Sequence, residues 1–385
     1  MVISVLLFRH SFCINNNTRE KPSEMYFSNI TEISDIALEK LSKNNGYLLI
    51  YVAEKSASQT EALIAMLNEQ QLQFFGGIYP TIIQDTKNYD EGILIVKMPF
   101  VEKVMKLLLN DESTFQQIKN IEGAQTAFLL SDGLMAEPDS FLRKIYSLFG
   151  SQMNFIGGGA GFMTLKQQPC VFTNDGLFQN GAVMALLNHK SKIGVKHGWD
   201  VFAGPFIATS TEKNIIKELN WRPAFEVYKE VIEERTDKRF SDNNFFEIAK
   251  DFPFGIYKEG AEYVVRDPFI VNENNEIICI SEIPENSTLQ ILNGDPDTLV
   301  DAAKEVAKMT LTGKDTVGFL MVFECISRVI YLGERFEEEL KAMADVYTKC
   351  GCKIRGVSTL GEIASSGTGF VDLYNKTIVA SSLYE

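Results

Sequence analysis

Short, nearly continuous apolar runs alternate along this chain with segments in which apolar residues recur every three or four positions. The runs at 47–52, 127–130 and 319–323 have the length and composition of strands that are buried on both faces. Each run is followed by a polar turn and an amphipathic helix. One face of the second helix is expected to be buried, with the residues Phe141, Leu142, Ile145, Leu148 and Phe149. The alternation predicts an α/β fold.

Each predicted helix leads into a second apolar strand that ends in glycine. These glycine corners read FFGGIYPTII at 74–83, FIGGGAG at 155–161 and IRGVSTLGEI at 354–363. A further apolar strand follows every corner. We interpret this pattern as three copies of one strand–helix–strand–glycine unit.

The segment between the second and third copies has a different pattern. Residues 252–292 predict antiparallel strands with turns at Asn274–Asn275 and Pro284–Asn286. Together with the three units, they predict an α/β protein with two lobes of mixed sheets flanked by helices.

The composition and the patterns divide the chain into three parts. Residues 1–24 end in a polar, asparagine-rich stretch and are expected to form a loosely ordered extension. An N-terminal domain is predicted at 25–220 and a C-terminal domain at 221–385.

The bulk composition excludes several classes of partner. A net charge of −14 over 385 residues argues against binding to nucleic acid or to an anionic membrane surface. No run of 18 apolar residues is present, so no segment is expected to span a bilayer. The six cysteines are scattered rather than spaced as a disulfide framework. We therefore expect reduced thiols and a cytoplasmic location.

The glycine corners allow two interpretations. Neither GxGxxG at the start of a helix nor a phosphate-binding GxxxxGK loop is present, so the corners do not predict a nucleotide site. Glycine can serve a close approach of neighbouring strands. Alternatively, backbone amides at a corner can hold an anionic group such as a carboxylate. On the second interpretation the candidate ligand contacts are Gly157, Gly158, Gly159 and Gly161.

Histidine is scarce, with only three in the chain. His197 stands out because Gly198 and Trp199 follow it. It is interpreted as a buried structural residue, as a ligand contact together with Trp199, or as an axial haem ligand. Cys350 and Cys352 lack two further zinc ligands at suitable spacing, so no metal and no cofactor is expected.

Charged residues gather around the third glycine corner. Arg328 and Arg355 are candidate partners for a ligand carboxylate, and Glu362 is a candidate partner for an ammonium group. The alternative is that these residues form structural ion pairs. A hydrolase or transferase that works through Cys325 or Ser131 is a further hypothesis. No convincing pair of nucleophile and base accompanies either residue, so the chain is not expected to be an enzyme.

Over roughly residues 45–380 the chain resembles the FIST sensory proteins (F-box and intracellular signal transduction). The resemblance rests on the order and spacing of several motifs. They are LSDGLM at 130–135, FIGGGAG at 155–161, HGW at 197–199, Pro223–Ala224 with Tyr228, Cys325 with Arg328, GEIA at 361–364, and Asn375–Lys376–Thr377. The sequence departs from the family pattern at Trp221–Arg222, where Asp–Gly is usual, and its first glycine corner is less typical.

The resemblance implies a FIST N-terminal domain, its C-terminal companion domain and a sensory role in signal transduction. Its expected ligand is a small metabolite, an amino acid or a similar polar compound, bound between the two lobes near FIGGGAG, His197 and the third corner. Some relatives are similar to haem-based nitric-oxide sensors, which is the alternative function here. A separate signalling protein, a kinase or a chemotaxis-type protein, is the expected output partner.

Overall fold

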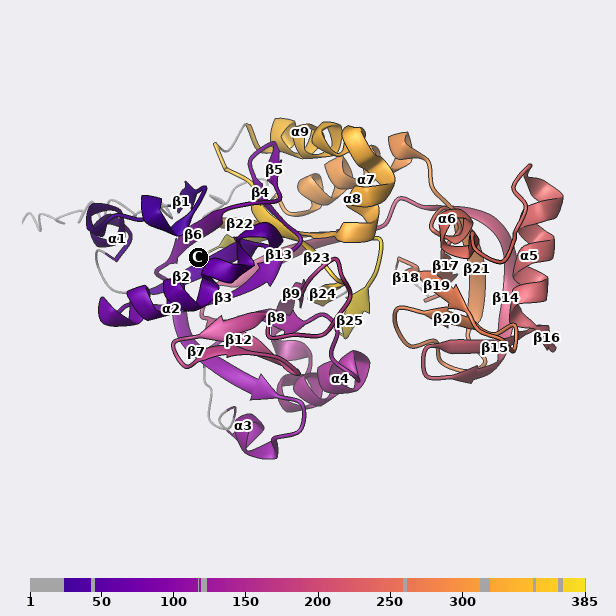
Figure 1. Ribbon diagram of the computed structural model, residues 1–385, viewed down its shortest axis with the longest axis horizontal. Coiled ribbons are helices and arrows are strands. Elements are labelled where there is room, and N and C mark those ends of the chain that lie inside the picture. The colour runs from indigo at the N-terminus through magenta and orange to yellow at the C-terminus, as the bar shows by residue number, and fades with distance from the viewer. Residues whose placement is uncertain are drawn as a thin grey trace, which may run out of the picture.

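A computed structural model describes residues 24–42, 46–116, 118, 123–258, 262–311, 319–348, 351–365 and 370–384. The chain forms a larger lobe of three mixed sheets flanked by helices and a smaller lobe of antiparallel strands (Figure 1). This architecture confirms the predicted two-lobed α/β class. Except for Glu24, the predicted extension 1–24 lies outside the described residues. No helix within these ranges is long and apolar enough to cross a membrane.

Each sheet of the larger lobe contains a parallel pair of strands joined through one or two helices. The first pair is β2 (Tyr47–Ala53) and β3 (Gln73–Tyr79), joined through α2 (Thr60–Glu69). The second is β8 (Thr126–Asp132) and β9 (Asn154–Ala160), joined through α4 (Pro138–Phe149). The third is β22 (Phe319–Cys325) and β23 (Arg355–Thr359), joined through α8 (Ile326–Leu332) and α9 (Phe336–Tyr347).

An antiparallel strand completes the other side of each pair. These strands are β6 (Ile93–Met98), β12 (Gly181–Leu187) and β26 (Ile378–Tyr384). The edge strands beyond them are β1 (Glu24–Phe27), β7 (Val101–Leu108) and β13 (Lys190–Lys196). The three sheets therefore share one strand arrangement.

After each glycine corner the chain forms a hairpin, and the first strand of that hairpin pairs with a neighbouring sheet. The hairpin of β4 (Thr81–Gln84) and β5 (Lys87–Tyr89) pairs with β23. The hairpin of β10 (Val171–Thr173) and β11 (Gly176–Phe178) pairs with β3. The hairpin of β24 (Glu362–Ser365) and β25 (Val371–Tyr374) pairs with β9. This exchange interlocks the sheets, and strand pairs such as β4 with β23 cross the predicted domain boundary at 220/221.

The smaller lobe, on the right in Figure 1, is built around β14 (Asp200–Glu212), which pairs with strands on both sides. Its strands pair antiparallel in the order β18-β17-β21-β14-β15-β20-β19, which confirms the antiparallel strands predicted for 252–292. The other elements are β15 (Ile215–Leu219), β16 (Arg222–Pro223), α5 (Ala224–Arg235), α6 (Phe245–Ala249), β17 (Phe254–Ile256), β18 (Val264–Arg266), β19 (Pro268–Val271), β20 (Ile277–Cys279) and β21 (Thr288–Asn293).

Helices cover the outer faces of the sheets with their apolar sides. On α4, Phe141, Leu142 and Ile145 are buried as the spacing predicts, whereas Leu148 is 45% exposed because it lies near the helix end, beyond the packed stripe. The helix α7 (Pro296–Met309) packs on α9, β13 and β26. The remaining helices are η1 (Ile30–Glu32), α1 (Asp35–Ser42), η2 (Glu54–Gln59), α3 (Glu112–Gln116), η3 (Gly150–Gln152) and η4 (Gly333–Arg335).

One glycine in each parallel pair allows the two strands to approach. Gly76, Gly157 and Gly356 occupy the second strands, directly opposite Ile50, Leu129 and Val322. A Cβ atom at these glycines would lie 2.0, 1.9 and 2.0 Å, respectively, from the carbonyl oxygen of the opposite residue. Any side chain at these positions would displace sheet backbone, so glycine is required for the pairing.

Beyond these positions the three corners bind one another through backbone atoms. The amide of Gly159 donates to the carbonyl of Gly361, and the amide of Leu360 donates to the carbonyl of Gly159, both at 2.8 Å. The amide of Gly161 donates to the carbonyl of Ile78 in the first corner, also at 2.8 Å. The corners thus form the junction at which the three sheets meet.

We predict that Gly157→Ala destabilises the protein by at least about 3 kcal/mol, because the clash is with a sheet carbonyl that no rotamer change can relieve. Gly176→Ala is the control. Gly176 has φ +106°, but no atom lies within 4 Å of the position that a Cβ would take, so only conformational strain of about 1–2 kcal/mol is expected. Urea unfolding of both variants measures the difference. Equal losses would show that the close approach is not the constraint.

Candidate functional site

The glycines that were predicted to contact a ligand are packed against backbone and side-chain atoms of the protein. A Cβ atom at Gly158 would lie 2.5 Å from the Cγ2 atom of Thr359, and one at Gly161 would lie 2.6 Å from the Cδ1 atom of Leu360. The amides of Gly159 and Gly161 already donate to backbone carbonyls. The geometry therefore favours the interpretation of close strand approach for these corners.

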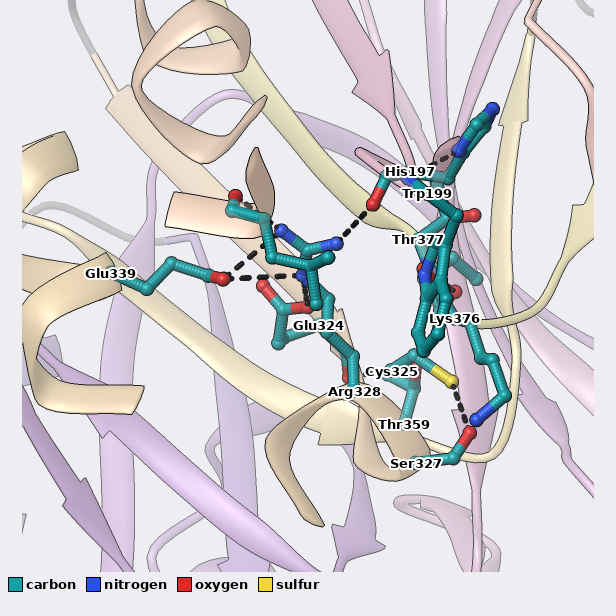
Figure 2. A network of polar contacts seen from close by, with 12 residues as sticks. His197, Trp199, Glu324, Cys325, Ser327, Arg328, Glu339, Thr359, Lys376 and Thr377 are labelled. Atoms are coloured by element: carbon teal, nitrogen blue, oxygen red, sulfur yellow. Dashed lines mark hydrogen bonds and ion pairs between the residues drawn. The ribbon is translucent and has the colours of Figure 1, made fainter. Parts of the chain in front are cut away.

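Arg328, on α8, is fully buried and bound by protein groups on all sides (Figure 2). Its guanidinium lies 3.0 Å from a carboxylate oxygen of Glu339 and 3.1 Å from one of Glu324. It also donates to the backbone carbonyls of Leu299, at 2.6 Å, and His197. The five donors of arginine are largely used inside the protein. This arginine thus joins α8, α9, α7 and the segment that contains His197.

His197 is 5% exposed, and both of its ring nitrogens have close neighbours. Its Nδ1 atom accepts a hydrogen bond from the Trp199 amide at 2.8 Å, and its Nε2 atom lies 3.0 Å from the Glu262 carboxylate. Burial opposes ionisation of Glu262, but His197 and Lys196 together lower its pKa below the ordinary value. Iron ligation would have to displace one of these neighbours, so the geometry does not favour the haem interpretation.

Three further residues that were predicted to contact a ligand bind protein groups instead: Trp199, Glu362 and Arg355. The indole of Trp199 donates to the carbonyl of Lys376 at 3.0 Å. Buried Glu362 accepts from the hydroxyl of Thr359 at 2.7 Å, and burial raises its pKa. Arg355 pairs with Glu24 on the edge strand β1. The structure therefore brings His197, Trp199 and Arg328 together. Glu362 is near enough to Arg328 for the charge of that arginine to act on its pKa, whereas Arg355 pairs with Glu24.

A cavity of about 570 Å³ lies between the two lobes. The larger lobe contributes segments that follow β8 and β9, the start of α8, and the third glycine corner; the smaller lobe contributes α6, β19, β20 and their loops. None of the nine predicted ligand contacts lines it. The lining residues are Gly133, Leu134, Met135, Ala136, Pro138, Asp139, Met163, Leu165, Lys213, Asn214, Phe246, Asp267, Phe269, Ile278, Cys279, Ile280, Ser281, Glu282, Cys325, Ile326, Ser327, Ile330, Leu360, Gly361, Leu373 and Asn375.

Asp267 gives the cavity a buried carboxylate. Its Oδ2 atom lies 3.3 Å from the ammonium of Lys376, which is itself fully buried and donates to the carbonyl of Lys250 at 3.0 Å. Burial raises the pKa of Asp267, and the charge of Lys376 and the hydroxyl of Ser327 oppose that rise. The ion pair of Asp267 and Lys376 therefore lies beside a cavity wall that is otherwise largely apolar.

Cys325 also lines the cavity, and its thiol is 3.3 Å from the hydroxyl of Ser327 (Figure 2). Burial raises the pKa of this thiol to about 12, so it stays protonated at neutral pH. A protonated thiol is a weak nucleophile. Ser131, the other candidate nucleophile, is buried on β8 and does not line the cavity.

Sequence reasoning missed the acidic residues of the cavity, which are Asp139, Asp267 and Glu282. One signal was present at Asp267, because Arg266–Asp267 interrupts the apolar run VVRDPFIV at 264–271. Two adjacent charges within a buried strand need partners, which marks a polar site. Asp139 gave no such signal, since acidic residues are common in the first turn of a helix.

Two family models match this chain. The FIST N domain matches residues 47–222, and the FIST C domain matches residues 224–365. The chain belongs to the FIST family. FIST domains are sensory domains of signal transduction. A search of curated proteins gave no significant match.

The cavity takes its lining from both FIST domains. Residues 133–214 of the lining lie in the FIST N domain, and residues 246–361 lie in the FIST C domain. Leu373 and Asn375 follow the matched region. The cavity therefore depends on the two FIST domains being packed together.

We predict that Arg328→Met lowers the free energy of unfolding by about 3–5 kcal/mol, because Glu324 and Glu339 would lose their buried cation. Arg335→Met, at a 39% exposed side chain that also binds carboxylates, should change the unfolding free energy far less, because exposed ion pairs contribute little stability. Chemical denaturation compares the two. An Arg328→Met variant of normal stability that has lost ligand binding would instead assign this arginine to a ligand.

The buried carboxylates predict a pH dependence. Burial, and then the charge of Glu339, raise the pKa of Glu324 well above 4.5 in the folded protein. The stability due to this group is fully present below pH 4.5 and is lost as the pH rises through the folded-state pKa, by up to about 1.4 kcal/mol per pH unit. Glu324→Gln should therefore flatten the decline in unfolding free energy that is expected as the pH rises above 4.5.

Glu338→Gln is the matched control for this pH series, because the Glu338 side chain is 57% exposed. It should leave the slope of unfolding free energy against pH unchanged. A slope that responds equally to both substitutions would contradict the assignment to Glu324.

Proposed function

We propose that this protein is a cytoplasmic sensory protein that binds a small metabolite, an amino acid or a similar polar compound, in the cavity between its lobes. The observation that carries the proposal is the cavity itself, which has a lining from both FIST domains and a few polar groups among apolar walls. Ligand sites occur preferentially at such domain junctions.

Ion pairs that join the lobes beside the cavity suggest how binding is transmitted. Arg143 on α4 lies 3.3 Å from Glu282, and Lys258 of the smaller lobe lies 2.6 Å from Asp372. Partly exposed pairs of this kind contribute little stability. A ligand that contacts both lobes can shift their relative position if it binds one arrangement better than the other. A separate kinase or chemotaxis-type protein is the proposed reader of this change.

The proposal includes no catalysis. Burial keeps the Cys325 thiol protonated, and the described histidines bind elsewhere: His197 contacts Trp199 and Glu262, and the Nδ1 atom of His189 contacts Asn188. Nucleophilic catalysis needs a base within hydrogen-bond reach of the nucleophile. The cavity's chemistry supports binding better than turnover.

A thermal-shift screen of amino acids and related metabolites tests the proposal. A ligand at a hundredfold excess over its Kd should stabilise the folded protein by about 2.7 kcal/mol. Ile330→Trp, at a half-exposed residue of the cavity wall, should fill the cavity and abolish the shift. Ile36→Trp, at a 78% exposed residue of α1, should preserve it. Shifts that survive Ile330→Trp would place the site elsewhere.

A further inference from the structure

We propose that the cavity selects a small molecule with an ammonium group and an apolar body. This inference rests on the proposed function, because it assumes that the cavity between the lobes is the ligand site. It narrows the ligand class by charge and shape.

Two carboxylate oxygens of the cavity lining are buried without a hydrogen bond from any described residue. They are the Oδ1 atom of Asp267 and the Oδ2 atom of Asp139. In each side chain the other oxygen faces a cation: Lys376 lies 3.3 Å from Asp267, and Arg266 lies 3.6 Å from Asp139. A buried acceptor without a donor costs free energy. A ligand that donates hydrogen bonds would remove that cost.

The cations of these two pairs lie behind the carboxylates. Lys376 is fully buried and Arg266 is 5% exposed, and neither belongs to the cavity lining. Arg266 is held in place by the backbone carbonyls of Glu282, at 2.8 Å, and Leu373, at 2.9 Å. The carboxylate of each ion pair, and not its cation, therefore belongs to the cavity lining.

The other charged residues of the lining strengthen this asymmetry. Glu282 adds a third carboxylate. Lys213 is the one cation among the lining residues, and its side chain is 68% exposed and lies 3.2 Å from Glu137. A ligand carboxylate would thus meet acidic groups inside and only a solvated lysine at the edge. An ammonium group suits the interior better.

The rest of the lining fits an apolar body. Large apolar side chains dominate the walls, and several of them are partly exposed, as expected for an open mouth. They include Met163, Leu165, Phe246, Phe269, Ile280 and Ile330. Apolar walls with a few placed polar groups are typical of small-molecule sites. We therefore expect an amine to bind best, the corresponding amino acid less well and the corresponding acid least.

Four probes with the same aromatic body test this order: 2-phenylethylamine, phenylalanine, 2-phenylethanol and 3-phenylpropionate. Calorimetry at pH 7 should give the lowest Kd for the amine. The neutral alcohol should bind about ten- to a hundredfold more weakly, because it lacks the charge-assisted hydrogen bond. The acid should bind more weakly still.

Asp139→Asn should weaken amine binding by about ten- to a hundredfold and leave the alcohol unchanged, since it removes one carboxylate while Arg266 keeps its backbone acceptors. Asp242→Asn, at an exposed aspartate outside the lining, is the matched control and should change neither. Asp267→Asn is informative only with a melting temperature, because Lys376 would lose its buried partner.

Different results would separate this inference from the proposed function. An acid or amino acid that binds as tightly as the amine, and is blocked by Ile330→Trp, would overturn the charge preference and leave the sensory site in place. Absence of amine binding up to millimolar concentration would overturn the inference directly. Amine binding that persists in Ile330→Trp would place the ligand outside the cavity and contradict both.

Discussion

At three glycine corners, the backbones of paired strands approach so closely that no side chain fits between them. Gly76, Gly157 and Gly356 lie against the carbonyl of the opposite strand, where a Cβ would be about 2 Å away. Just beyond them, Gly159 and Gly361 join two corners by a 2.8 Å hydrogen bond. Because the corners meet, each hairpin continues into a neighbouring sheet. The two FIST domains therefore share sheets and cannot separate without breaking strand pairs.

Buried charge is placed around this junction in two different ways. At Arg328 the charge is closed off: Glu324 and Glu339 surround the guanidinium, and carbonyl oxygens take its remaining donors. Asp267 and Asp139 instead belong to the lining of the cavity, and one oxygen of each carboxylate has no hydrogen bond from a described residue. The Arg328 network fixes the packing of α8 and α9 on the sheet, and the two carboxylates of the lining give the neighbouring cavity its polarity.

The cavity, which is the proposed ligand site, lies at the junction of the two lobes. It lies where α8 and the third glycine corner of the larger lobe face β19 and β20 of the smaller one. The wall from the larger lobe is fixed by the interlocked sheets. Buried pairs such as Lys376–Asp267 and partly exposed pairs such as Lys258–Asp372 join the lobes beside it. A ligand in the proposed site would contact both lobes and could shift their relative position if it binds one arrangement better than the other.

The amino-acid sequence was enough to predict the α/β class, the strands and helices of the parallel pairs, the glycine corners and the family, because these follow from local periodicity and motif order. It also placed Phe141, Leu142 and Ile145 in the core, although Leu148 on the same helix face is exposed. Only the tertiary structure decided what Arg328, His197 and the glycines contact. It alone brought Asp139 and Asp267, 128 positions apart in the chain, to one cavity, since such proximity arises from sheet pairing and lobe packing rather than from local pattern.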